Sequence, residues 1–160
     1  GVKALLNLGV AGAASPSLGL YDVVAGDSAI QYDFDLSYVG DLRRGQLPGF
    51  DDEFIPLYDG YVKGFEKLGL RCGRLATIDT FRYNKENLEF LRRNNVLAED
   101  MEIAAIAQVA EFMGVRVASV KSISNAIAEN GGDEFGAGLF KAIDAYVRLL
   151  PDIVNVMRGE

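Results

Sequence analysis

The stretch EDMEIAAIAQVAEF, residues 99–112, predicts a helix buried in a protein core, because residues 103–110 are apolar on nearly every side. Three acidic residues, Glu99, Asp100 and Glu102, stand at its start. An N-cap Asp and first-turn carboxylates are favoured by the free N–H groups and the macrodipole, by roughly 0.3–1 kcal/mol each. That explains one or two of the charges. An ionised Glu102 on a buried helix needs a further partner, and a ligand hydroxyl would serve as one.

Apolar runs rich in β-branched residues alternate with helical periodicities on both sides of this stretch. The alternation predicts an α/β sandwich with a largely buried sheet. We expect strands at 4–12, 73–79 and 115–124, one or two strands in 21–36, and helices at 51–69, 84–94 and from about 133 onward, the last kinked by Pro151. The helix at 51–69 would end at Gly69, a C′ glycine, and would carry on one face Phe54, Leu57, Tyr58, Tyr61, Phe65 and Leu68.

The composition predicts one domain spanning residues 1–160, because 160 residues with 49% hydrophobic content suffice for one core and not for two. A net charge of −7 and a pI near 4.7 argue against a nucleic-acid or anionic-membrane partner. The single cysteine, Cys72, fits a reducing compartment, and the chain shows neither a membrane-spanning apolar run nor a signal peptide. We therefore expect a soluble, cytoplasmic protein.

The chain contains no histidine. This removes the commonest general base, the Ser-His and Cys-His nucleophile systems, and the commonest metal ligand. Catalysis would then fall to carboxylates, amides, hydroxyls and backbone groups. We expect neither a metal nor another cofactor.

Three segments with candidate binding residues follow predicted strands: GVAGA at 9–13, TIDTF at 77–81 and SISN at 122–125. Open α/β sheets bind ligands at such strand ends. Each segment alone also has a structural explanation, because a Gly-Ala turn, a core Phe81 and a turn-forming Asn125 are all ordinary. The hypothesis of a binding site therefore depends on the three segments together.

A resemblance to one family is carried by six segments in order: LLNLGVAGA, YDVVAGDSAIQYDFDLSYVG, GQLPGF, GRLATIDTF, DMEIAAIAQVAEFMGV and VASVKSISN. They resemble the methylthioadenosine/S-adenosylhomocysteine nucleosidases of the nucleoside phosphorylase superfamily. The resemblance covers nearly the whole chain, and Glu102 and Asn125 have the family's spacing of 23 positions. It implies a three-layer α/β/α sandwich around a mixed, partly closed sheet. It also implies hydrolysis of the N-glycosidic bond of a purine nucleoside, giving a free base and a ribose derivative.

On the sugar side, the resemblance implies that Glu102 binds the ribose 2′ and 3′ hydroxyls, with Met101 packed under the sugar. The two oxygens of an ionised carboxylate suit two adjacent hydroxyls, because each accepts a charge-assisted hydrogen bond. Val10, Ala11 and Gly12 would line the same side.

On the purine side, the resemblance implies that Phe81 stacks on the base and that the backbone of Arg82 reads its edge. Ser124 and Asn125 would face N7. The family has Asp in place of Asn125, and that Asp delivers a proton to N7. An amide is no general acid, and loss of general-acid help costs a factor of about 10²–10⁴ in rate. Asn125 therefore leaves open a 6-oxopurine substrate, an inactive relative, or an engineered mutant.

Two further departures bear on the reaction. Family members carry earlier strands and an N-terminal Glu that activates the attacking water, and this chain begins after them, which would leave the strand at 4–12 with an unpaired edge. Phosphorylases of the superfamily hold phosphate with an Arg and a Ser where this chain has Asn7 and Val10. Hydrolysis is therefore favoured over phosphorolysis. A nucleoside-binding protein without turnover is the third alternative.

In the family, a loop from the neighbouring subunit covers the 5′ substituent, which implies a homodimer. The matching loop, YVGDLRRGQLPG, has Val39 and Asp41 in the places of two aromatics and keeps Pro48. Val39 and Pro48 are thus the candidates for the 5′ pocket. Asp41, Arg43 and Arg44 either favour a polar 5′ substituent or are solvated loop charges.

Overall fold

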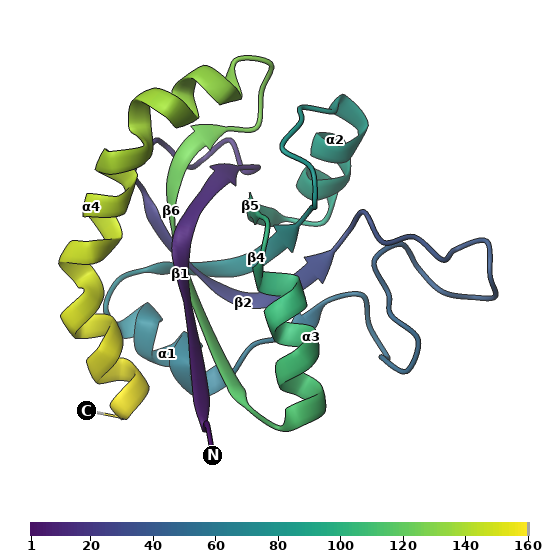
Figure 1. Cartoon of the computed structure of the whole chain (residues 1–160), viewed down its shortest axis with the longest axis horizontal. Coiled ribbons are helices and arrows are strands. Elements are labelled where there is room, and N and C mark those ends of the chain that lie inside the picture. The colour runs from purple at the N-terminus through teal and green to yellow at the C-terminus, as the bar shows by residue number, and fades with distance from the viewer. Residues whose placement is uncertain (160) are drawn as a thin grey trace.

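A computed structural model describes residues 1–159 and shows an α/β fold with a mixed sheet and four helices (Figure 1). The predicted fold class is confirmed. The strands are β1 (Ala4–Ala13), β2 (Val23–Gln31), β3 (Ile55–Pro56), β4 (Arg71–Thr77), β5 (Val96–Asp100) and β6 (Arg116–Ala126). The helices are α1 (Asp59–Lys67), α2 (Lys85–Arg93), α3 (Ile103–Met113) and α4 (Gly131–Arg158).

Five strands form a closed ring in the order β2, β4, β5, β1, β6, because β6 also pairs with β2. β2, β4 and β5 are parallel to one another, and β1 is parallel to β6. The two groups meet in antiparallel pairs, β1 with β5 and β2 with β6, and β3 adds an antiparallel strand to β2. The register pairs Gly12 with both Glu99 and Asn125, so the carboxyl ends of β1, β5 and β6 meet at one place.

The second edge of β1 is mostly unpaired in the described part of the chain. β1 pairs with β6 along its whole length, from Ala4 to Ala13. Its antiparallel partner β5 reaches it only at Gly12 and Ala13. The backbone groups of β1 before Gly12 therefore have strand partners on one side only.

Helices cover both sides of the ring (Figure 1). α1 and α4 pack together on one side, where Phe65 and Ile153 join Val120 of β6 in a buried cluster. α3 lies on the other side and packs on β2, β4 and β6, with Ala107 in the largest buried cluster. α2 packs beside β5. This arrangement leaves the carboxyl ends of β1 and β6 accessible near the start of α3.

The prediction of a helix at 51–69 is wrong for its first half. α1 begins only at Asp59, and the residues before it form the short strand β3 and an extended segment. The reason is Pro56, which restricts the preceding residue to extended backbone and donates no N–H. Phe54 and Leu57 are buried as expected, but from extended chain rather than from a helical face. The end is as predicted, with Gly69 at a φ of +82°.

The helix expected at 99–112 is also shorter than predicted. Glu99 and Asp100 belong to β5, a strand that the sequence pattern did not indicate, and α3 begins at Ile103. The helix is buried on one face only, because Val109 is 58% exposed and Phe112 is 79% exposed. Its apolar outer face is therefore open to solvent in this chain.

The remaining elements deviate less from expectation. Residues 21–36 contain one strand, β2, and the chain from there to β3 extends away from the sheet in Figure 1. α4 continues through Pro151 to Arg158. Across residues 1–159, no helix combines the length and apolar character needed to cross a membrane.

Candidate functional site

A pocket of about 360 Å³ lies where the carboxyl ends of β1, β5 and β6 meet the start of α3. It contains eight of the residues predicted from the sequence: Val10, Ala11, Gly12, Phe81, Met101, Glu102, Ser124 and Asn125. Glu99, Asp100 and Phe135 complete its wall. The structure thus brings together the three strand-end segments that the sequence analysis singled out. The role of each residue stays a prediction.

The other predicted site residues lie elsewhere. Arg82 lines an adjoining hollow of about 260 Å³, which shares Phe81, Glu99 and Asn125 with the pocket. Val39 and Pro48 line neither hollow and are exposed on the segment between β2 and β3. A place for them beside a 5′ group would need a second subunit.

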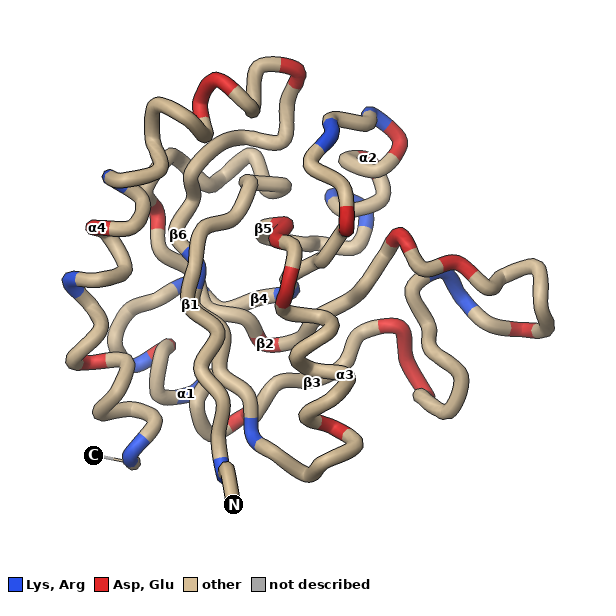
Figure 2. The backbone as a smooth tube through the Cα atoms, in the orientation of Figure 1, with Lys and Arg blue, Asp and Glu red and all other residues tan. Residues whose placement is uncertain are grey.

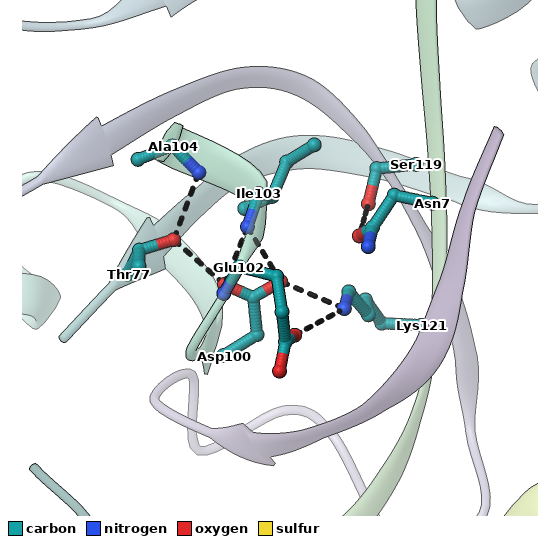
Figure 3. Close-up of polar contacts among 8 residues, drawn as sticks. All are labelled: Asn7, Thr77, Asp100, Glu102, Ile103, Ala104, Ser119 and Lys121. Atoms are coloured by element: carbon teal, nitrogen blue, oxygen red, sulfur yellow. Dashed lines mark hydrogen bonds and ion pairs between the residues drawn. The ribbon is translucent and has the colours of Figure 1, made fainter. Parts of the chain in front are cut away.

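Asp100 fixes the start of α3 (Figure 3). Its carboxylate accepts hydrogen bonds from the backbone N–H groups of Glu102 and Ile103, each at 3.2 Å. Thr77 of β4 donates its hydroxyl to the same carboxylate at 2.7 Å and accepts from the backbone N–H of Ala104 at 2.9 Å. Free N–H groups at a helix start favour such an acidic partner. The helix cap is therefore Asp100, on the strand, and not the side chain of Glu102.

Lys121 lies beneath the pocket and is 1% exposed. Its Nζ is 2.7 Å from Asp100 Oδ2 and 3.1 Å from Glu102 Oε2 (Figure 3). Gly9 is opposite Lys121 in the β1–β6 register, and a Cβ at Gly9 would lie 3.2 Å from Nζ. A buried ammonium group needs such carboxylate partners because desolvation penalises an isolated charge.

Glu102 is less buried than the sequence suggested, with 56% of its side chain exposed. Its partner within the chain is Lys121, which holds one carboxylate oxygen. The other oxygen points away from Lys121 in Figure 3. In Figure 2 the acidic positions at the end of β5 and the start of α3 adjoin each other near the centre of the fold. Glu102 is thus held at the pocket with an oxygen left for a hydroxyl donor.

Ser124 and Asn125 present polar groups from the end of β6. Both are nearly fully buried. The Ser124 hydroxyl donates to Asn125 Oδ1 at 2.8 Å, and Asn125 Nδ2 donates to the carbonyl of Ala126 at 3.0 Å. An amide nitrogen carries two N–H donors, so Asn125 has one more to offer a ligand.

Glu99 is the pocket carboxylate without a cationic partner. The Tyr32 hydroxyl donates a hydrogen bond to it. The pKa of Glu99 is raised from its ordinary 4.5 to about 7, mainly by burial and to a smaller extent by the carboxylates of Asp100 and Asp33, while the hydrogen bond from Tyr32 lowers it. Near neutral pH this carboxyl therefore exists in both protonation states.

Two aromatic rings border the pocket. Phe81 is 59% exposed, and its ring centroid is 5.5 Å from that of Phe135 on α4, in a tilted arrangement. Met101 is half-exposed beside Glu102. An exposed aromatic face and a thioether at one opening suit a flat, apolar ligand group.

Three features of the site were not predicted from the sequence: Lys121, Phe135 and the position of Glu99 on a strand. The sequence does contain a signal for Lys121, because a lone lysine within the apolar run VRVASVKSIS must either leave the core or pair with a carboxylate. It contains no signal for Phe135, since the contact of Phe135 with Phe81 depends on how α4 packs. Predicting the position of Glu99 would have required the recognition of β5 as a strand.

Comparisons with known proteins identify a family and several relatives to which this chain is similar. A family model described as the phosphorylase superfamily matches residues 1–149. The 5′-methylthioadenosine/S-adenosylhomocysteine nucleosidase of Geobacillus kaustophilus is 28% identical, over 96% of this chain and 68% of its own length. A DeoD-type purine nucleoside phosphorylase of the same organism is 35% identical, over 79% of this chain and 53% of its own length.

Among solved structures, one similar protein is an Asp-to-Asn mutant of the Helicobacter pylori nucleosidase MTAN with 5′-methylthioadenosine in its active site. Its TM-score is 0.89 at 30% identity, over 97% of this chain and 69% of that one. The chain thus spans between about half and two thirds of the length of these relatives.

The buried ion pair gives a stability prediction. Lys121→Met leaves Asp100 buried without its cation, so we expect the free energy of unfolding to fall by about 3–5 kcal/mol. Lys63→Met is the matched control, because Lys63 pairs with Asp59 on the exposed surface of α1, where solvent screening leaves such pairs little effect on stability. Urea-induced unfolding of both variants measures the difference. Equal small losses would contradict the role given to Lys121.

Glu99 gives a prediction for pH dependence. Between pH 4.5 and about 7 the folded chain holds a proton on Glu99 that the unfolded chain has lost, so stability falls as pH rises through this window. The loss is on the order of 3 kcal/mol, at about 1.4 kcal/mol per pKa unit. Unfolding measured from pH 4.5 to 8 should show this slope in the wild type and lose it in Glu99→Gln. The exposed Glu86→Gln on α2 should keep it.

Proposed function

Because the chain belongs to the phosphorylase superfamily, we propose that it binds a purine nucleoside in the pocket at the ends of β1, β5 and β6 and hydrolyses its N-glycosidic bond. The substrates would be methylthioadenosine- or S-adenosylhomocysteine-like nucleosides, and the products a free purine and a ribose derivative. The observation that carries the proposal is the convergence of Phe81, Glu102 and Asn125 on one pocket. The similarity to a nucleosidase that holds 5′-methylthioadenosine supports it.

The ribose would bind at Glu102. One oxygen of this carboxylate is held by Lys121, which fixes its orientation, and the ionised group accepts from two adjacent hydroxyls. Met101 and Gly12 border the same pocket. A carboxylate oriented before the ligand arrives loses less entropy on binding than a free surface Glu.

The purine would stack on Phe81, with its imidazole edge toward Asn125. The backbone N–H of Arg82 already donates to the carbonyl of Thr80 at 3.1 Å, so Arg82 offers the base its carbonyl acceptor. An acceptor suits the 6-amino group of adenine better than the 6-oxo group of hypoxanthine, because two facing acceptors repel. This supports a 6-aminopurine as the base.

Phosphorolysis fits the pocket less well. Asn7 directs its Oδ1 to the Ser119 hydroxyl at 3.0 Å, and Val10 offers no donor. The cation nearest to them, Lys121, is already paired with Asp100 and Glu102. A phosphate dianion needs donors and positive charge, so water is the better nucleophile for this site.

The proposal includes a homodimer and a cytoplasmic location. The exposed apolar side chains Val39, Val109, Phe112 and Met113 lie on the 32–54 segment and on α3, and the ring of Phe50 contacts that of Phe112. Exposed apolar side chains on α3 and the contact of Phe50 with Phe112 support a subunit interface at this face. A single cysteine fits a reducing compartment.

Nucleoside binding and base release test the function. We expect wild-type protein to bind methylthioadenosine in calorimetry, and Glu102→Gln to weaken binding by about 10- to 100-fold, as for a lost charge-assisted hydrogen bond. Glu111→Gln, on the exposed side of α3, should change nothing. Base release from methylthioadenosine that needs no phosphate identifies the hydrolase, whereas a phosphate requirement or binding without release identifies the alternatives. Equal affinity of Glu102→Gln and wild type would contradict the proposed ribose site.

The dimer has its own test. Light scattering should give twice the chain mass at high micromolar concentration, and Val109→Glu with Phe112→Glu should give the monomer, because charges would be buried in the interface. Leu68→Glu, on the exposed end of α1, is the control and should stay dimeric. A wild-type monomer under these conditions would contradict the proposal.

A further inference from the structure

We infer that Glu99 is the general acid of this pocket: its carboxyl proton passes to a ring nitrogen of the purine as the N-glycosidic bond breaks. The inference rests on the proposed function and names the group that does the work an amide at position 125 cannot do. Asn125 is a hydrogen-bond donor and acceptor, but it carries no proton that it can release near neutral pH.

The register of the sheet places Glu99 and Asn125 on either side of Gly12. Gly12 pairs with Glu99 of β5 on one side and with Asn125 of β6 on the other. Residues opposite one another in a sheet project from the same face, so Glu99 and Asn125 flank Gly12 at about 10 Å, two strand spacings. A Cβ at Gly12 would lie 3.1 Å from Ile127 Cγ1 and 3.2 Å from Asn125 Nδ2, so the glycine lets these two side chains pack close to β1. The open space that Glu99 and Asn125 share is the pocket that both line.

Glu99 and Asn125 also line both the pocket and the adjoining hollow, together with Phe81. A purine stacked on Phe81 would therefore lie between the Asn125 amide and the Glu99 carboxyl. Both groups would be within reach of ring nitrogens at different edges of the base. The geometry gives the departing base one neutral donor and one acid.

The other two carboxylates of the pocket already have partners within the chain. Asp100 caps α3 and pairs with Lys121, and Glu102 also pairs with Lys121. These contacts give both carboxylates structural partners within the chain. Glu99 has neither kind of partner, so it is the pocket group suited to carry a proton.

The carboxylates around Glu99 favour its protonated form, and the hydrogen bond from Tyr32 opposes them. Tyr32, which follows β2, donates its hydroxyl to Glu99, and Asp33 and Asp100 are the nearby carboxylates. The adjoining hollow adds one cation, Arg82, and one further carboxylate, Glu129. The strand neighbours Ala76 and Gly12 carry no charge. Burial therefore acts together with surrounding negative charge to raise the pKa of Glu99 to about 7.

The reaction step balances with water as the only co-reactant. The C1′–N bond breaks and its electron pair goes to the purine, while the Glu99 proton adds to a ring nitrogen, so the base leaves neutral. Water forms the new C1′–O bond and loses a proton to solvent. Glu99 is left as a carboxylate and regains a proton from solvent. A general acid of this kind is most effective when its pKa is near the working pH.

Adenine binding tests the inference without turnover. A protonated Glu99 donates to a ring nitrogen, whereas an ionised Glu99 faces its lone pair, so wild-type affinity for adenine should fall by up to about tenfold per pH unit above pH 7. Glu99→Gln keeps an N–H donor, so its affinity should stay flat from pH 6 to 9. The exposed Glu86→Gln should follow the wild type. A flat wild-type profile, or an unchanged slope in Glu99→Gln, overturns the inference.

Base release gives the second measurement. Glu99→Gln should release base from methylthioadenosine about 10²–10⁴-fold more slowly, with methylthioadenosine affinity kept within a few-fold. Asn125→Asp in the Glu99→Gln background should recover part of the rate, because it returns an acid to the other side of Gly12. Release by Glu99→Gln at the wild-type rate overturns the inference. Wild-type protein that binds neither adenine nor methylthioadenosine contradicts the proposed function and removes the inference with it.

Discussion

The buried ion pair between Asp100 and Lys121 is the contact on which the pocket depends. It joins the end of β5 to the middle of β6 across β1, and it requires Gly9 for the lysine to reach its partner. The same carboxylate caps α3 through backbone N–H groups and accepts from Thr77 of β4. One side chain thus connects three strands and a helix. The direction in which α3 leaves the sheet, and with it the position of Glu102, follows from this connection.

A buried pair of this kind contributes specificity more than stability. Removing both charges together is often neutral for a fold, whereas removing one is costly. Here the lysine also contacts Glu102, which is more than half exposed at the pocket. The ammonium group therefore orients a carboxylate that is partly open to solvent. Such an orientation would favour the proposed ribose binding, because the carboxylate is ordered before the ligand binds.

The fold was predictable where local signals were strong. β1 and β6 are runs of mainly apolar or small residues. α2 begins at Lys85, directly after Asn84, whose side chain accepts from the Asn87 N–H at 3.1 Å as an N-cap should. β5 escaped prediction because it is five residues long and ends in two carboxylates. The strand-end residues of the pocket were predictable from their order in the chain. The Lys121 pair was not, because it depends on the register of β1 with β6 and on the packing of α3.

Consecutive carboxylates acquire different chemistry from the alternation of a strand. Asp100 turns toward α3 and Lys121, and Glu99 turns to the opposite face, where the Tyr32 hydroxyl donates to it. Burial without a cationic partner raises the pKa of Glu99, which suits a proton donor. A chain without histidine thereby gains a group that titrates near neutrality. Of the three acidic residues before α3, only Asp100 caps the helix, and the proposed reaction gives Glu99 the proton transfer and Glu102 the hydroxyl binding, so helix capping alone does not explain all three.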